Sequence, residues 1–197
     1  PALTAVVTGA VVGGDAINYT LGTAATQFSS VAGGPYAITV TLGSNPNYDV
    51  SKTDSTLTVG AKTASVAANA KVKTYGDDNP ALDAVVTGTV NGDTLAYTLE
   101  TTAVKFSPVA SYPITVTLGL NTNYNVSQTD GALAVGAKAA SVAANDKTKT
   151  YGDDNPALDA VVTGTVNGDT LNYTLATDAL KFSAVAGYPI TVPLGVN

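Results

Sequence analysis

The chain has 197 residues, a net charge of −6 and 45% hydrophobic residues, and it contains no Cys, His, Met or Trp. The missing Cys and His exclude disulfides, imidazole catalysis and the usual zinc sites. Nine Lys, no Arg and 15 acidic residues argue against a nucleic-acid partner, because phosphate binding needs clustered positive charge. No apolar run approaches the ~18 residues of a membrane span, and no segment has the period of an amphipathic helix.

The dominant pattern is a repeat with a spacing of 76 residues. The segment YGDDNPALDAVVTGTVNGDTL begins at Tyr75 and again at Tyr151, and residues 61–121 differ from 137–197 at eleven of 61 aligned positions. Tyr36 onward matches Tyr112 onward at the same spacing. A fixed period of this kind indicates an array of similar structural units. The sequence therefore predicts three repeats: 1–60, incomplete at its N-terminus, 61–136, complete, and 137–197, incomplete at its C-terminus.

Both ends of the chain thus fall inside a repeat, and residue 1 is Pro, so we expect the chain to be a window from a longer protein. A unit this small buries only about 60% of the surface that its unfolded chain exposes. Neighbouring repeats of the same chain are therefore its expected partners.

The complete repeat predicts short strands separated by turns. Residues 112–118 alternate most clearly, with Tyr112, Ile114, Val116 and Leu118 on one face. In chain order the predicted strands cover residues 65–68, 71–75, 85–90, 95–99, 105–109, 112–118, 124–129 and 132–135.

Turn chemistry separates these strands. Asn91-Gly92-Asp93 and Asp130-Gly131 tolerate positive φ, and residues 76–80 combine self-capping Asp and Asn side chains with a proline. About eight short strands at regular spacing indicate an all-β sandwich.

One local pattern favours an immunoglobulin-like (Ig-like) sandwich. A tyrosine that begins an alternating strand, Tyr112 after Ala110-Ser111 and Tyr188 after Ala186-Gly187, resembles a tyrosine corner. The predicted fold class is therefore all-β, a tandem array of small Ig-like sandwiches, and a β-grasp-like small β domain is the alternative.

The acidic loops are the candidate metal sites. Calcium takes about six to eight oxygen ligands and could use such loops. Asp and Asn before Pro are also ordinary turn residues, and the spacing of an EF-hand loop is missing, so the sequence favours no cofactor. The calcium candidates are Asp77, Asp78 and Asn79, with Asp153, Asp154 and Asn155 in the third repeat.

Enzymatic activity is not expected, because every candidate acid recurs with the repeat and an active site seldom does. The ten Tyr could form sugar-stacking platforms, but their periodic positions favour packing. A Lys–Asn isopeptide cross-link at Lys71, Lys73 or Lys105 would need a buried acid beside the pair, which the sequence does not reveal.

The ordered motifs of the repeat resemble the MBG domain (YGX type) of bacterial surface adhesins over effectively the whole chain. Ser111 departs from the glycine that usually precedes the tyrosine, while Gly187 keeps it. The motifs are Lys73-x-Tyr75-Gly76-x-x-Asn79-Pro80-x-Leu82, Thr87-Gly88-x-Val90-x-Gly92-Asp93-x-Leu95, Tyr112-x-Ile114, Asn123-Tyr124-x-Val126 and Leu133-x-Val135.

This resemblance implies a secreted or cell-surface array that serves in adhesion or as a stalk, and it brings no catalytic residues and no defined ligand. The leading hypothesis is an extended extracellular stalk or fibre. One alternative is a filament subunit in which identical chains join by β-strand complementation. The other is a module that binds glycans or mucin through exposed tyrosines.

Overall fold

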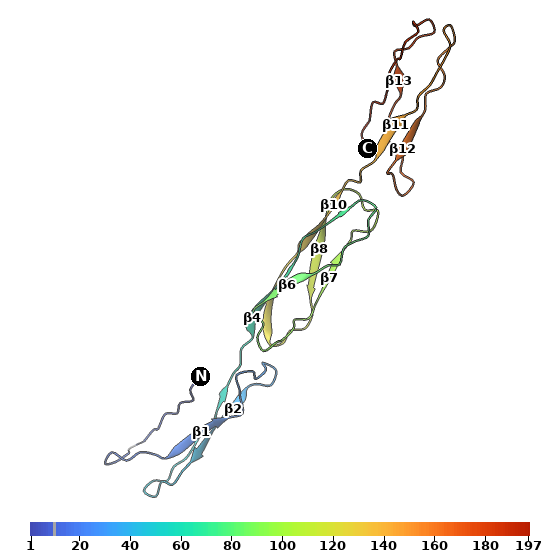
Figure 1. Cartoon of the computed structure of the whole chain (residues 1–197). Helices are drawn as coiled ribbons and strands as arrows, with labels where there is room; N and C mark the ends of the chain where they lie inside the picture. The colour runs from blue at the N-terminus through green and yellow to red at the C-terminus, as the bar shows by residue number, and fades with distance from the viewer. Residues whose placement is uncertain (10) are drawn as a thin grey trace. The chain divides into compact units, whose positions relative to one another are not determined.

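The computed structural model describes residues 1–9 and 11–197, and all regular structure in them is β-strand (Figure 1). The chain divides into two compact units. Unit 1 comprises Pro1–Asn69, Asp83–Glu100 and Thr115–Asp130, and unit 2 comprises Ala70–Leu82, Thr101–Ile114 and Gly131–Asn197. Each unit takes part of the complete repeat, and each is described separately below.

The strands follow the repeat. Those of the first repeat are β1 (Tyr19–Thr23), β2 (Tyr36–Leu42) and β3 (Ser55–Leu57). Those of the second are β4 (Lys62–Ala68), β5 (Lys71–Thr74), β6 (Ala84–Thr87), β7 (Tyr97–Thr101), β8 (Ser111–Leu118), β9 (Tyr124–Thr129) and β10 (Gly131–Gly136). Those of the third are β11 (Ser141–Ala144), β12 (Ala160–Thr163), β13 (Ala176–Thr177) and β14 (Ile190–Thr191).

Unit 1 contains two three-stranded sheets. The sheet of the first repeat has the order β1-β2-β3 and is antiparallel throughout. The other has the order β6-β4-β9, in which β4 pairs antiparallel with β6 and parallel with β9. The parallel ladder begins with Lys62 opposite Tyr124 and ends with Ala67 opposite Thr129.

Unit 2 repeats this combination of parallel and antiparallel pairing. Its strands β5 and β10 belong to a sheet of order β5-β10-β8-β7, in which β10 pairs parallel with β5, from Leu133 opposite Lys71 to Gly136 opposite Thr74. It pairs antiparallel with β8, where Leu133 lies opposite Tyr112. The third repeat contributes the pairs β11-β12 and β13-β14, both antiparallel.

Two short breaks let the chain pass from one sheet to the other. Between β4 and β5, the Asn69 amide N–H donates to Asp83 O (2.9 Å) and its side-chain Nδ2 donates to Asp83 Oδ1 (2.8 Å). Between β9 and β10, Asp130 Oδ1 accepts from the backbone N–H of Val116 (2.8 Å). The Asp130 carboxylate thus satisfies a backbone N–H where the ladder is interrupted, and a backbone bond with a side-chain bond joins Asn69 to Asp83.

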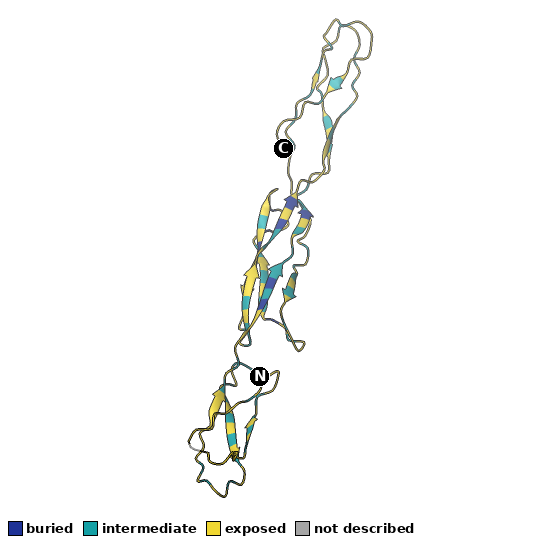
Figure 2. Ribbon diagram, turned by 90° about the vertical axis from the view of Figure 1, so that its left-hand side faces the viewer, coloured by how far each residue is buried: buried dark blue, intermediate teal, exposed yellow. Residues whose placement is uncertain are grey.

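The most deeply buried hydrophobic side chains of the described residues all lie between Ala64 and Val135, where Figure 2 shows the dark blue segments. In unit 1 the core cluster is Ala64, Val66, Leu95 and Val116. In unit 2 the buried side chains include Ile114, Leu133 and Val135. Ile114 is 0% exposed and Val116 is 1% exposed, as the alternation of residues 112–118 predicts.

Most predicted strands of the complete repeat are confirmed. Strand β9 has the predicted bounds, and β4, β8 and β10 contain the predicted segments with one to three extra residues. The turn prediction at residues 91–93 is also confirmed, because Asn91 has φ 59° and Gly92 has φ 75°.

The predicted strand over residues 105–109 is wrong, because this segment is a loop. Ser107 N–H donates to Val104 O (3.0 Å), and Ser107 Oγ accepts from Val104 N–H (2.8 Å). These local bonds use backbone groups that a strand would need for its ladder.

The predicted strand over residues 85–90 also ends early, at Thr87. It is followed by Gly88, whose φ is 84°. A Cβ at Gly88 would lie 2.6 Å from Thr63 O, so only glycine fits this position.

Candidate functional site at the two ends of the repeat

The side chains singled out by the sequence gather at two groups of loops in the complete repeat. The aromatic end, residues 75–80 and 103–109, belongs to unit 2. The turn end, residues 90–93 and 121–124, belongs to unit 1. The third repeat has a corresponding turn at Val166–Asp169, in unit 2.

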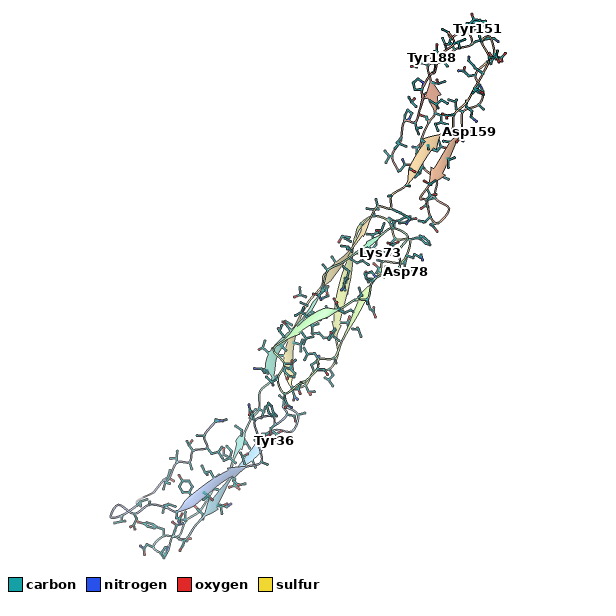
Figure 3. All side chains as sticks on the ribbon, in the orientation of Figure 1. Tyr36, Lys73, Asp78, Tyr151, Asp159 and Tyr188 are labelled. Atoms are coloured by element: carbon teal, nitrogen blue, oxygen red, sulfur yellow. The ribbon has the colours of Figure 1, made fainter. Side chains whose placement is uncertain are left out.

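A buried lysine organises the aromatic end. Lys73 is 9% exposed, and its Nζ donates to Val104 O (2.6 Å), Asp77 O (3.2 Å) and Lys105 O (3.4 Å) (Figure 3). Bonds from a charged donor are stronger than neutral ones, so this amine ties the two loops together. The isopeptide hypothesis for Lys73 stays a prediction, since its printed partners are three backbone carbonyls.

The predicted calcium residues lie in the same loops and make the contacts of turn residues. Asp77 N–H donates to Thr74 O (3.0 Å), Asp78 Oδ1 lies 3.2 Å from Lys105 Nζ, and Asn79 Nδ2 donates to Ala103 O (2.5 Å). Their counterparts Asp153, Asp154 and Asn155 make the same three contacts in the third repeat.

The Asp78 side chain is 84% exposed. No group of three or more His, Cys, Asp or Glu residues that could hold a metal ion occurs among the described residues. Calcium binding at these loops stays a prediction.

The tyrosine that begins β8 holds the loop before it. Tyr112 OH donates to Pro108 O (3.0 Å), four residues upstream. Tyr188 OH donates to Ala184 O (3.1 Å), and Tyr36 OH donates to Ser30 O (2.9 Å). A hydroxyl bonded to the backbone a few residues upstream is the geometry of a tyrosine corner.

A second tyrosine closes the turn end. Tyr124 OH donates to Asp93 Oδ2 (2.7 Å), and the same hydroxyl accepts from Val90 N–H (3.1 Å). The hydrogen bond to the Asp93 carboxylate raises the pKa of Tyr124, because it stabilises the protonated phenol. The first repeat has the same arrangement, in which Tyr48 OH donates to Asp15 Oδ2 (3.0 Å).

No sequence pattern pairs Tyr75 with Phe106, but their rings pack together at the aromatic end. Their centroids are 6.0 Å apart and the rings are tilted by 58°, and Tyr151 and Phe182 repeat this geometry. The only signal for the pair was that both residues recur at the repeat spacing.

A hollow lies in each of the two units. The hollow in unit 2, about 560 Å³, is lined by residues that include Tyr151, Tyr188 and Ile190. The matching space in the complete repeat is filled by Leu133 and Val135 of β10, which are 0% and 3% exposed. Unit 1 has a similar hollow of about 590 Å³ beside β1 and β2. The hollow in unit 2 therefore corresponds to a core position of the complete repeat.

The chain is therefore an all-β tandem-repeat protein whose loop residues bind one another and the backbone. It belongs to the MBG domain (YGX type) family, whose model matches residues 1–58, 64–134 and 140–197. This match confirms the resemblance drawn from the motifs. MBG repeat domains are non-catalytic structural modules, and tandem MBG repeats are typical of bacterial surface proteins.

Comparison with curated proteins found no match, and comparison with solved structures found none either. Within residues 1–9 and 11–197, no helix is long and apolar enough to cross a membrane.

Proposed function

We propose that this chain is part of an extracellular, cell-surface stalk in which MBG repeats add length. The observation that carries the proposal is the parallel pairing of the first strands of the complete repeat with its last strands. In unit 1, β4 and β9 advance in the same direction, and in unit 2, β5 and β10 do the same. Within each unit, the later strand therefore carries the chain onward in the direction in which the earlier strand carried it. Repeats joined in series then extend the protein.

The connections between repeats support this proposal. Gly60-Ala61 and residues 137–140 link the repeats, and neither contains a flexible Gly/Ser tract. With strands that rise about 3.3 Å per residue, each repeat would add roughly 30 to 40 Å if its strands follow the stalk. The role of each repeat is then to lengthen the stalk, and this role needs no catalytic group.

We propose an Ig-like sandwich as the form of each repeat, with repeat boundaries at 1–60, 61–136 and 137–197. Support comes from the tyrosine-corner bonds of Tyr36, Tyr112 and Tyr188, and from the seven strands β4 to β10 in two sheets. The buried Val116 alternates with exposed neighbours on its strand, and the buried Val66 lies between half-buried neighbours, which is compatible with the inner face of a sandwich.

The location is tested by labelling intact cells of the source bacterium with an antibody raised against this chain. We expect labelling without lysis, and loss of the label after brief treatment of intact cells with a protease. Label that appears only after lysis would refute the surface location.

The mechanical role is tested by comparing chains that carry increasing numbers of the 61–136 repeat. We expect the maximum dimension in small-angle X-ray scattering to increase by a constant step with each repeat. A dimension that grows only as the cube root of mass would refute the stalk. Beads coated with the chain test the adhesive alternative, because a pure stalk retains no glycan or mucin above background.

A further inference from the structure

A contact between successive repeats lies inside unit 2. Gly76, in the aromatic end of the second repeat, packs against the turn Val166–Asp169 of the third repeat. A Cβ placed on Gly76 would lie 2.9 Å from Cγ2 of Val166. The glycine has φ 86°, so it provides both the left-handed backbone and the space that the valine occupies.

The residue before this glycine contacts the same turn. The Asp169 carboxylate is the largest influence on the pKa of the Tyr75 hydroxyl and raises it, and Asn167 acts in the opposite direction, so both side chains lie near this hydroxyl. Asn167 and Gly168 have φ 60° and 76°, so the turn has a defined backbone shape. Val166 of the turn thus contacts Gly76 through its apolar side chain, and the polar side chains of Asn167 and Asp169 lie near the Tyr75 hydroxyl.

The third repeat shows the same surface without a turn on it. Tyr151 is 62% exposed and Phe182 is 68% exposed, whereas Phe106 in the second repeat is 38% exposed. A Cβ on Gly152, which has φ 93°, would meet no atom within 4 Å. The ring pairs of the two aromatic ends have the same geometry, and the glycine beside the ring pair packs against a turn in the second repeat but not in the third.

Unit 1 supplies an independent contact between corresponding ends of two repeats. Val31 lies in the loop of the first repeat that corresponds to residues 106–109, and its backbone N–H donates to Asn123 Oδ1 (3.0 Å). Asn123 is part of the turn end of the second repeat. In unit 1 this contact joins the loop after Phe28 to Asn123, and in unit 2 the contact joins Tyr75 and Gly76 to the turn Val166–Asp169, so each unit contains a contact between successive repeats.

We infer that the aromatic end is a docking surface whose partner is the Val-Asn-Gly-Asp turn of the following repeat. Tyr75, Gly76 and Phe106 form the receiving surface, and Val166, Asn167 and Asp169 are the residues that occupy it. Docking of this kind restricts the angle between neighbouring repeats, so the repeats do not reorient freely relative to one another. The inference concerns the repeats themselves and does not rest on the cellular location proposed above.

Distance measurements between spin labels test the docking in the whole chain. The chain has no Cys, so Val72→Cys and Thr148→Cys introduce the only two attachment points, at exposed positions that correspond in the second and third repeats. We expect pulsed electron paramagnetic resonance to give one narrow distance distribution. Gly76→Ala should broaden it, because the new methyl group collides with Val166.

Matched substitutions in the third repeat separate docking from local strain. Gly152→Ala has the same unfavourable φ but an open surrounding, and Tyr151→Phe removes a hydroxyl with no turn beside it. Both should leave the distribution narrow, while Tyr75→Phe should broaden it. We expect Tyr75→Phe to raise the undocked fraction about tenfold, equivalent to ~1.4 kcal/mol.

Two results would overturn the inference: a broad distribution in the parent chain, or equal effects of Gly76→Ala and Gly152→Ala. Circular dichroism of each variant verifies that the strands are intact. If Gly76→Ala unfolds the second repeat, Tyr75→Phe decides alone, since it keeps the ring that packs on Phe106. The distances between the spin labels therefore test the docking, whereas cell labelling and X-ray scattering test the stalk proposal, so failure of one can be told from failure of the other.

Discussion

Replacing Lys73 with Met tests whether the buried amine holds the aromatic end together. Methionine retains an unbranched apolar stem but has no donor for the carbonyls of Asp77, Val104 and Lys105, which lie 2.6 to 3.4 Å from Nζ. Lys149 is the matched control, because its Nζ donates to Leu180 O (2.6 Å) and Asp153 O (3.3 Å) and lies in a more exposed setting.

The size of the effect follows from these contacts. A hydrogen bond from a charged group contributes about 1.5 to 3 kcal/mol, and a buried acceptor without a partner costs about 1 to 3 kcal/mol. Desolvation of the ammonium group offsets part of this, because Lys73 is only 9% exposed. We expect Lys73→Met to destabilise the aromatic end by ~2 to 3 kcal/mol, which is a roughly 30- to 150-fold rise in local opening. Water can replace the amine in the exposed setting of Lys149, so Lys149→Met should cost less than ~1 kcal/mol.

Hydrogen–deuterium exchange with mass spectrometry is the suitable assay, because a repeat array does not unfold in a single two-state step. Exchange should accelerate in peptides that cover residues 74–79 and 103–107 and remain unchanged over β4 and β9. Equal effects of the two substitutions, or unchanged exchange in the loops after Lys73→Met, would refute the reasoning that burial makes this lysine important.

Three further predictions concern other contacts. Tyr124→Phe should lower the unfolding temperature at neutral pH. The pKa of Tyr124 is raised above 10.0, so the stabilisation by its hydroxyl is complete below that pH and is lost as the pH rises through the raised value. A difference in unfolding temperature between the parent chain and the Tyr124→Phe variant that persists in strong alkali would contradict this prediction. Asp54→Asn should destabilise the first repeat at neutral pH, because the backbone N–H of Val40 holds the pKa of Asp54 below 3.8. This stabilisation is present above pH 3.8 and is lost as the pH falls through the lowered pKa. Parallel acid titrations of the parent chain and the variant would reveal the difference. Gly88→Ala should destabilise the chain by more than ~3 kcal/mol, because the new Cβ would collide with Thr63 O. Gly92 also has a positive φ but lies in open space, so Gly92→Ala should cost only ~1 to 2 kcal/mol. Equal urea midpoints for the two variants would contradict this prediction.

Alternation of apolar residues predicted the strands that bury one face. It placed Tyr112–Leu118 and Tyr124–Thr129 well, because their inward residues are apolar and their outward residues are polar. The turn at residues 91–93 was equally readable, since Asn and Gly tolerate the positive φ that it adopts.

Apolar alternation fails for β5, where Val72 is 77% exposed and Lys73 is buried. The pattern cannot show that loop carbonyls need a charged donor at that position. One sequence signal does point there: Val72 is replaced by Thr148 in the third repeat, whereas Lys73 is kept as Lys149. A variable apolar residue beside an invariant charged one indicates which of the two faces the interior.

The loops were harder to predict because their contacts are distant in sequence. The 105–109 segment has the composition of a strand, and its loop form depends on Ser107 bonding Val104 and on the amine of Lys73. The candidate calcium residues were placed correctly in loops, but their partners, such as Lys105 and the Ala103 carbonyl, are about 25 residues away along the chain. The docking surface needed the relative placement of two repeats, which no local pattern encodes.

The parallel ladder of β4 and β9 determines how the repeat responds to force. If tension is applied through the chain at Lys62 and through the strand that continues from Thr129, the two strands are pulled lengthwise past each other. The hydrogen bonds from Lys62–Tyr124 to Ala67–Thr129 then carry the load together, in shear. An antiparallel hairpin pulled at its two open ends would instead release its bonds one pair at a time, as in a zipper. Under such a load, the parallel pairing of β4 with β9 makes these hydrogen bonds resist the pull together.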